Sequence, residues 1–327
     1  MRIENRYHLP EAYVRAVSYD DYEPAGDISV TTLAQPAQII ELRRRHEDEI
    51  TIDASELSYV LMGKAVHYAL AAARADNALV EERLTIDMVG WTIGGKPDLY
   101  EGGGPLTDGN ILSDWKLTSA WSFVFAPKLE WLAQLNMYAY LLAEYGFPVK
   151  KIQAVGILRD WQKARRNDHG YPRRPVLARP FPLWPFEHTR KYMEARVKEH
   201  RKARDKGKWP PCSDNDRWMR NEQWAVMPGH PPAKPRARAI AVFGPGSARK
   251  GGELEANAFV ETLRHQHKPS HVQHRPGVNT RCAEYCPVAP FCDQWVELKP
   301  KRTAAPKVRT VTLEEATQIL ETPRRKR

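Results

Sequence analysis

The sequence has few cysteines, no long hydrophobic run and no visible internal repeat. Four cysteines among 327 residues are too few for a secreted fold stapled by disulfides. No stretch approaches the ~20 consecutive apolar residues that a membrane-spanning helix needs. The first residues, from Met1 to Arg6, lack the apolar segment of a secretion signal. We therefore expect a cytoplasmic globular protein with no membrane partner.

Positively charged residues outnumber negatively charged ones. Lys and Arg number 50 against 40 Asp and Glu, which gives a net charge of +10. Two blocks carry +5 each: residues 159–179, with seven basic and two acidic residues, and residues 187–208, with nine and four. Such blocks indicate a stripe that follows the phosphate backbone of a nucleic acid. The alternative is an ordinary solvated helix face and loop.

Hydrophobic periodicity predicts an α/β core. Two segments, 84–89 and 91–93, alternate around Gly90 and predict a hairpin whose second arm ends at Leu99-Tyr100. Apolar spacing close to 3.6 residues predicts a helix over 55–75. Further helices are expected over 36–49, 128–145, 187–206 and 246–263, and further strands over 111–116 and 152–158. Strands 111–116 and 152–158 are joined by a helix and should be parallel, which predicts a mixed sheet flanked by helices.

After Leu158 the sequence becomes rich in proline and carries all four cysteines. We therefore divide the chain into an N-terminal extension with a basic helix (1–50), an α/β core (51–160), a basic helix with a cysteine module packed on the core (161–300), and a basic flexible tail (301–327). A capping-box pattern at Thr312 predicts one short helix in the tail.

Three short segments of the core combine residues suited to metal chemistry: Gly95-Lys-Pro-Asp98, Asp114-Trp-Lys116 and Gln134-Leu-Asn-Met-Tyr138. Asp114 and Lys116 are two apart on a strand and share a face, whereas Gln134 and Tyr138 are four apart on a helix. If the strand over 111–116 lies beside the hairpin, Asp98 arrives next to Asp114. Two carboxylates beside a lysine suit Mg²⁺ or Mn²⁺, and His67 would favour Mn²⁺. Each segment alone has an ordinary structural explanation, but the combination is hard to obtain by chance.

These segments resemble the PD-(D/E)XK nuclease superfamily in its RecB-like branch, over residues 55–160. The family motif is a helix histidine, then Gly-x-x-Asp, Asp/Glu-x-Lys and Gln-x-x-x-Tyr, which match His67, Asp98, Asp114 with Lys116, and Gln134 with Tyr138. The resemblance implies a restriction-endonuclease-like core with a proline-rich, cysteine-bearing C-terminal module. Segments 211–218 and 281–292 are similar to what phage-encoded members carry after the core.

The resemblance also implies residue roles. His67, Asp98 and Asp114 would bind the metal, with the carbonyl of Trp115 as a further ligand. Lys116 would orient or activate the attacking water and stabilise charge on the phosphate. The remaining site residues are Gln134 and Tyr138, expected to hold the phosphate or the lysine, and Glu82, which stands where some relatives carry an acid.

The cysteines form a lone residue, Cys212, followed by a cluster of three, Cys282, Cys286 and Cys292. This spacing fits a four-iron four-sulfur cluster better than structural Zn²⁺, which usually shows two close pairs of ligands. Structural zinc and unligated thiols remain alternatives. RecB-like relatives carry the lone cysteine before the catalytic strands, and this chain carries it after them. A metal would clasp a 70-residue loop and hold the C-terminal module against the core.

The sequence therefore predicts a divalent-metal-dependent DNase that hydrolyses phosphodiester bonds, as an exonuclease in phage or bacterial DNA recombination, replication or repair. Its partners would be single- or double-stranded DNA and a phage or host recombination protein. Two alternatives remain: an end-trimming nuclease of the CRISPR-adaptation type, and a DNA-binding accessory subunit without catalysis. The complete set of two acids and a lysine argues against the accessory subunit.

Overall fold

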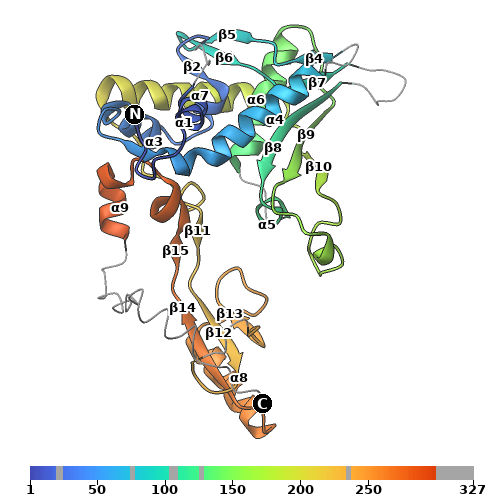
Figure 1. Cartoon of the computed structure of the whole chain (residues 1–327), viewed down its shortest axis with the longest axis vertical. Coiled ribbons are helices and arrows are strands. Elements are labelled where there is room, and N and C mark those ends of the chain that lie inside the picture. The colour runs from blue at the N-terminus through green and yellow to red at the C-terminus, as the bar shows by residue number, and fades with distance from the viewer. Residues whose placement is uncertain (20–24, 74–77, 103–109, 125–128, 233–236, 300–327) are drawn as a thin grey trace.

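The structure is a computed structural model that describes residues 1–19, 25–73, 78–102, 110–124, 129–232 and 237–299. It confirms a mixed α/β protein (Figure 1). The helix expected at Thr312 and the whole tail over 301–327 lie outside the described residues. Within the described ranges, no helix combines the length and the apolar character needed to cross a bilayer.

The main sheet has five strands in the order β10-β9-β8-β7-β4. Strands β8 (Ile111–Thr118) and β9 (Lys151–Leu158) run parallel, as expected for strands joined by a helix, here α6 (Leu129–Glu144). The other pairings in this sheet, which involve β10 (Val176–Phe181), β7 (Leu99–Glu101) and β4 (Ala78–Val80), are antiparallel. The sheet is therefore mixed, with β8 at its centre.

The predicted hairpin exists but belongs to another sheet. Strands β5 (Leu84–Met88) and β6 (Trp91–Gly95) pair with β2 (Ile28–Ser29) in a separate three-stranded sheet. The expected second arm breaks after Gly95 because Pro97 has no N–H to donate, and its carbonyl accepts the N–H of Glu81 instead. The chain then starts β7, which pairs with β8. Strand β8 therefore lies beside the end of the expected second arm, which is β7, and not beside β5 or β6, which belong to the other sheet.

The N-terminal extension contains regular elements besides the expected basic helix. Strand β1 (Arg2–Glu4) pairs with β3 (Thr51–Asp53), and α1 (Glu11–Ser18) and α2 (Val30–Leu33) are helical. The basic helix is α3 (Ala37–Arg45). The helix expected over 55–75 is a 3₁₀ turn, η1 (Ala54–Leu57), followed by α4 (Ser58–Ala72). The Asp53 side chain accepts the N–H of Ser55 and so caps this turn.

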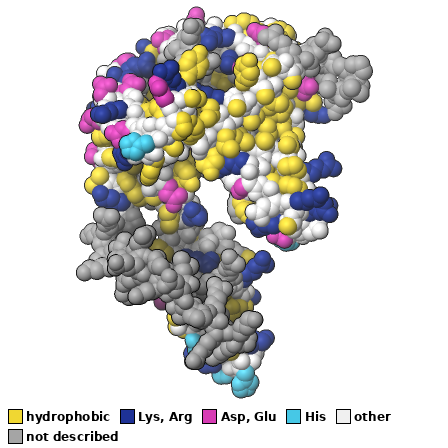
Figure 2. Space-filling model, in the orientation of Figure 1, with side chains coloured by type: hydrophobic (Ala, Val, Ile, Leu, Met, Phe, Trp, Pro, Cys, Tyr) yellow, Lys and Arg dark blue, Asp and Glu magenta, His cyan; other side chains and the backbone are white. Residues whose placement is uncertain are grey.

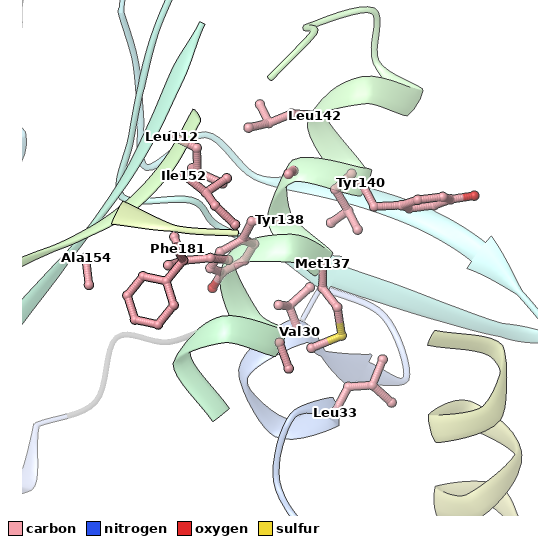
Figure 3. Packing of buried hydrophobic residues seen from close by; sticks show 14 of the residues in the cluster. Val30, Leu33, Leu112, Met137, Tyr138, Tyr140, Leu142, Ile152, Ala154 and Phe181 are labelled. Atoms are coloured by element: carbon pink, nitrogen blue, oxygen red, sulfur yellow. The ribbon is translucent and has the colours of Figure 1, made fainter. Parts of the chain in front are cut away.

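The core lies between the main sheet and α6. Leu112, Met137 and Ile152 are fully buried, and Figure 3 shows Val30 and Leu33 of α2 beneath Met137. Tyr138 and Tyr140 leave α6 on opposite sides (Figure 3). Helix α7 (Phe186–Lys206) buries Met193 and Val197 in the same core. A short helix, α5 (Ala120–Val124), and a 3₁₀ turn, η2 (Lys163–Arg165), flank the ends of β8 and β9.

The segment between Cys212 and Cys282 forms an unpredicted subdomain with its own core. Strands β12 (Gln223–Pro228), β13 (Ala241–Phe243) and β14 (Ser270–Arg275) make an antiparallel sheet against α8 (Glu253–His265). A ribbon of β11 (Met219–Arg220) and β15 (Val278–Asn279) leads to it. Figure 1 shows this subdomain extending away from the main sheet. Helical turns η3 (Arg281–Tyr285) and η4 (Ala289–Phe291) and helix α9 (Asp293–Leu298) follow.

Candidate metal centre

Five separate segments bring polar side chains to one cleft of about 1050 Å³. Helix α4 contributes His67, the turn after β4 contributes Glu81, and the residue before β7 is Asp98. Strand β8 and helix α6 contribute the rest: Asp114, Lys116, Gln134 and Tyr138. Asp98 and Asp114 therefore line the same cavity, although they come from different strands of the sheet.

His67, Glu81 and Asp98 form a group with the geometry of metal ligands. The His67 Nδ1 atom lies 3.5 Å from Asp98 Oδ1 and 3.6 Å from Glu81 Oε1. One ligand atom from each residue lies within 4.8 Å of the other two. One imidazole nitrogen with carboxylate oxygens suits Mn²⁺ or Mg²⁺, with the nitrogen favouring Mn²⁺.

The acid in this group is Glu81, whereas the sequence indicated its neighbour Glu82. Glu82 is exposed and does not line the cleft. The backbone of Glu81 has φ +51°, a left-handed conformation that ordinary residues adopt at a cost of about 1–3 kcal/mol. This conformation turns the Glu81 side chain toward His67, where Lys96 Nζ also holds its Oε2 at 2.7 Å. The hydrophobic periodicity of the sequence does not predict such a turn.

Asp98 is buried and held by the backbone of β8. Its Oδ2 accepts the N–H of Trp115 at 2.7 Å. Burial, followed by the charge of Asp114, raises the pKa of Asp98 to about 8. In a strand the N–H and C=O of one residue point to the same side, so the Trp115 carbonyl also faces the side of Asp98.

Asp114 is 2% exposed and carries an acceptor with no donor. Its Oδ1 accepts the Gln134 amide N–H at 3.1 Å, but its Oδ2 receives no hydrogen bond from any residue that the structure describes. Lys116 Nζ lies 2.5 Å from Oδ2 as an ion pair, outside hydrogen-bonding geometry. Asp114 Oδ2 is thus paired with a cationic side chain but not hydrogen-bonded, and carboxylate oxygens are the ligands that hard divalent ions prefer. The residues present therefore fit a hard divalent ion.

Gln134 ties the lysine to the carboxylate. Its Oε1 accepts from Lys116 Nζ at 3.1 Å, while its Nε2 donates to Asp114. Tyr138 lies one helical turn further along α6, and its hydroxyl is 3.3 Å from Thr31 Oγ1. Burial raises the pKa of Tyr138 to about 12, so the hydroxyl stays neutral and keeps a proton to donate. The predicted spacings on β8 and α6 thus bring these residues to one place.

The two basic blocks differ in the structure. On α7, Arg190 pairs with acids of its own helix, Arg196 and Arg201 donate to backbone carbonyls, and Arg204 covers the Trp91 ring. These cations fasten α7 to the core. The segment between β9 and β10 instead exposes Lys163, Arg166, Arg173 and Arg174, and Figure 2 shows Lys and Arg gathered on that lobe. Both blocks therefore present exposed cations, since Lys191, Lys198, Lys202, Lys206 and Lys208 of the second block are exposed as well.

The four cysteines converge on one small cavity beside α3, although Cys212 and Cys282 are 70 residues apart. Buried Gln38 of α3 links them: its Nε2 donates to Cys292 Sγ at 3.2 Å and its Oε1 accepts the Cys212 N–H at 2.8 Å. Sequence analysis missed this glutamine, which no motif marks. Burial raises the pKa of Cys212 to about 12 and also raises the pKa of Cys282 and Cys286.

The four cysteine sulfurs do not form a compact group of the kind that holds one zinc ion, among the described residues. Four thiolates on one zinc ion, each at about 2.3 Å, lie about 3.8 Å apart. In the part of the chain that the structure describes, no three of these sulfurs lie within 4.8 Å of one another. Next to Cys282, Arg281 forms an ion pair with Glu130 of α6 and so connects the cysteine group to the helix that carries Gln134.

No protein-family model and no curated protein matches the chain. Among solved structures, the chain is similar to one described as the crystal structure of SSO0001, with 16% identity and a TM-score of 0.40. The match covers 57% of this chain and 84% of that chain. A similarity at this level indicates neither fold nor function.

The raised pKa of Asp98 predicts a pH-dependent stability in the metal-free protein. Above its ordinary pKa the unfolded chain has released this proton, whereas the folded chain keeps it up to about pH 8. Between pH 6.5 and 8 the free energy of unfolding should therefore fall by about 1–2 kcal/mol more in the wild type than in Asp98→Asn. Urea denaturation in EDTA measures this difference. Parallel pH profiles for the two proteins would contradict the shift.

Adjacent glutamates provide a matched test of the ligand group. Glu81→Gln removes a charged ligand and should weaken Mn²⁺ binding about 10–100-fold, whereas Glu82→Gln should leave it unchanged. Isothermal titration calorimetry of each variant with Mn²⁺ measures the effect. A loss of affinity in Glu82→Gln alone would restore the position that the sequence indicated.

Proposed function

We propose that the chain is a divalent-metal-dependent deoxyribonuclease of the PD-(D/E)XK type. It would act as an exonuclease in phage or bacterial DNA recombination, replication or repair. The observation that carries the proposal is the convergence of His67, Glu81 and Asp98 with Asp114 and Lys116 in one cleft. A mixed sheet with β8 at its centre, joined to β9 through α6, supports a restriction-endonuclease-like core.

The ligand set is His67, Glu81, Asp98 and Asp114, with the Trp115 carbonyl beside them. Three carboxylates from separate elements give the oxygen ligands that Mg²⁺ and Mn²⁺ prefer. When bound, such a cation supplies a water of lowered pKa and offsets charge on the phosphate oxygens. Asp114 Oδ2 has no hydrogen-bond donor among the described residues, and this makes it the acceptor best placed to gain from the ion.

Lys116 acts beside these ligands. Its side chain is 20% exposed and lines the cleft, and its ammonium is held by Gln134 and Asp114. A positioned ammonium next to the carboxylates stabilises negative charge as it develops on a phosphate. Gln134 fixes the lysine and Asp114 in one geometry, and Tyr138 keeps a neutral hydroxyl behind them. These three residues orient the reacting groups.

The free positive surface suits a polyanion. Exposed cations between β9 and β10 are joined to α4 by Arg159, whose guanidinium lies 4.0 Å from the centre of the Tyr59 ring. Helix α4 carries His67, so this surface continues toward the cleft. Cations along such a path bind phosphates without regard to sequence, and salt weakens their binding.

Cleavage tests the assignment directly. Asp114→Asn and Lys116→Met should lower Mg²⁺- or Mn²⁺-dependent cleavage about 10²–10⁴-fold while DNA binding remains. The control is Asp87→Asn, since Asp87 is an exposed acid on β5 that bonds only within its own sheet, to Thr92. End-labelled linear DNA and circular DNA are compared, and an exonuclease degrades only the linear form. Equal activity in wild type and both site variants refutes the site.

For the cysteines we propose a four-iron four-sulfur cluster held by Cys212, Cys282, Cys286 and Cys292. The cavity that all four line, and the arrangement along the sequence of one lone cysteine and a group of three, support the cluster over Zn²⁺. Burial raises the pKa of the Cys212, Cys282 and Cys286 thiols, so a bound cation is needed to favour their deprotonated form. The cluster would clasp the C-terminal residues to α3.

Loss of one thiol tests this cofactor. Cys286→Ser should lower the melting temperature and remove bound iron together with visible absorbance, because one ligand is gone and the clasp opens. Tyr285→Phe is the control, as it changes the exposed neighbour and keeps its ring. Metal analysis and thermal denaturation of protein purified without oxygen give the readouts. An iron-free wild type with bound zinc would favour the zinc site instead.

A further inference from the structure

Two exposed tyrosines line the cleft of the metal centre. Tyr68 is 81% exposed and Tyr19 is 66% exposed, and both belong to the same cavity wall as His67 and Asp98. Tyr68 follows His67 directly in α4, and both residues line the cleft. Large aromatic rings left in water beside a site of chemistry indicate a binding partner for their faces.

The helix that carries Tyr68 is apolar and buries none of its residues. Over Ser58–Ala72, α4 has no buried side chain, and Tyr59, Val60 and Met62 are each about half exposed. Figure 2 shows hydrophobic side chains spread over the surface where Figure 1 places α4. A helix of this composition is normally packed against another element. Here it forms one wall of an open cleft.

Positive charge accompanies the aromatic rings. Arg15, Lys64 and Lys96 line the same cleft as Tyr19 and Tyr68. The Lys64 ammonium contacts the backbone carbonyl of Tyr19, which joins α4 to the end of α1. Cations beside exposed rings are the two components of surfaces that bind single-stranded nucleic acid: charges follow the phosphates and rings stack on the bases.

We propose that the cleft binds single-stranded DNA, with Tyr68 and Tyr19 stacking on bases next to the phosphate that is cut. The inference rests on the proposed nuclease function and names its substrate class. Within a duplex the faces of the bases are covered by their neighbours, so a tyrosine beside the ligand group finds stacking partners along an unpaired strand and not inside a duplex. Stacking tolerates any sequence because every base has an aromatic face.

Binding without cleavage provides the test. Fluorescence anisotropy in EDTA measures the affinity for a short labelled oligothymidine and for a duplex of equal length. Tyr68→Ala should weaken binding of the single strand by about 5- to 150-fold, the equivalent of one lost stacked base, and leave duplex binding unchanged. Tyr68→Phe should restore the affinity, since it keeps the ring. A strand of abasic spacers should bind wild type and Tyr68→Ala equally.

The control variant is Tyr7→Ala, because Tyr7 is 70% exposed but does not line the cleft. It should bind both substrates as the wild type does. Unchanged single-strand affinity in Tyr68→Ala, or an equal loss for strand and duplex, would overturn the inference.

Cleavage assays of the wild type separate the two proposals. If the enzyme cleaves single strands in preference to duplexes, and Tyr68→Ala reduces the cleavage of single strands, both the nuclease function and the stacking role are supported. Equal cleavage of strands and duplexes, unaffected by Tyr68→Ala, overturns the stacking role and leaves the nuclease standing. Absence of metal-dependent cleavage on every substrate overturns the nuclease, and with it the substrate class inferred here.

Discussion

The arrangement of the cleft depends on two carboxylates held together away from water. Burial and the charge of Asp114 make ionised Asp98 unfavourable, and a protein without compensating groups would not keep both. Around them the chain supplies the Trp115 N–H, the Lys116 ammonium and the Gln134 amide. One oxygen of Asp114 still receives no hydrogen bond from a described residue. A divalent cation bound here would stabilise the ionised form of Asp98, which burial and the charge of Asp114 disfavour.

Sequence periodicity predicted the parts of this site that lie on regular elements. Asp114 and Lys116 share a strand face because side chains in a strand repeat every two residues. Gln134 and Tyr138 share a helix face because a helix repeats every 3.6 residues. Glu81 was missed because its position depends on a single left-handed residue in a turn. Gln38 was missed because it meets the cysteines only through packing between segments more than 170 residues apart. Contacts of that kind leave no local pattern.

In the fold, too, regular elements were predicted from the sequence and contacts between distant segments were not. Helices α6 and α7 and strands β8 and β9 were located closely, and the parallel pairing of β8 and β9 followed from the helix between them. The two-residue strand β2 and the pairing of β1 with β3 carry too few residues to show alternation. Pro97 divided what looked like one strand between two sheets, and the subdomain over 219–279 lies in a proline-rich stretch whose strands are short. The positions of these elements depend on pairing with distant segments, which the local sequence does not reveal.

The ribbon of β11 and β15 has a consequence for how this chain can change over time. Met219 pairs with Asn279, so the polypeptide departs and returns at adjacent points, about 5 Å apart. The entropy of closing such a loop grows only slowly with its length. An ancestor could acquire, enlarge or discard the intervening residues without moving Cys212 or Cys282. The number of residues between those two cysteines can therefore change, while the position of their side chains beside α3 stays the same.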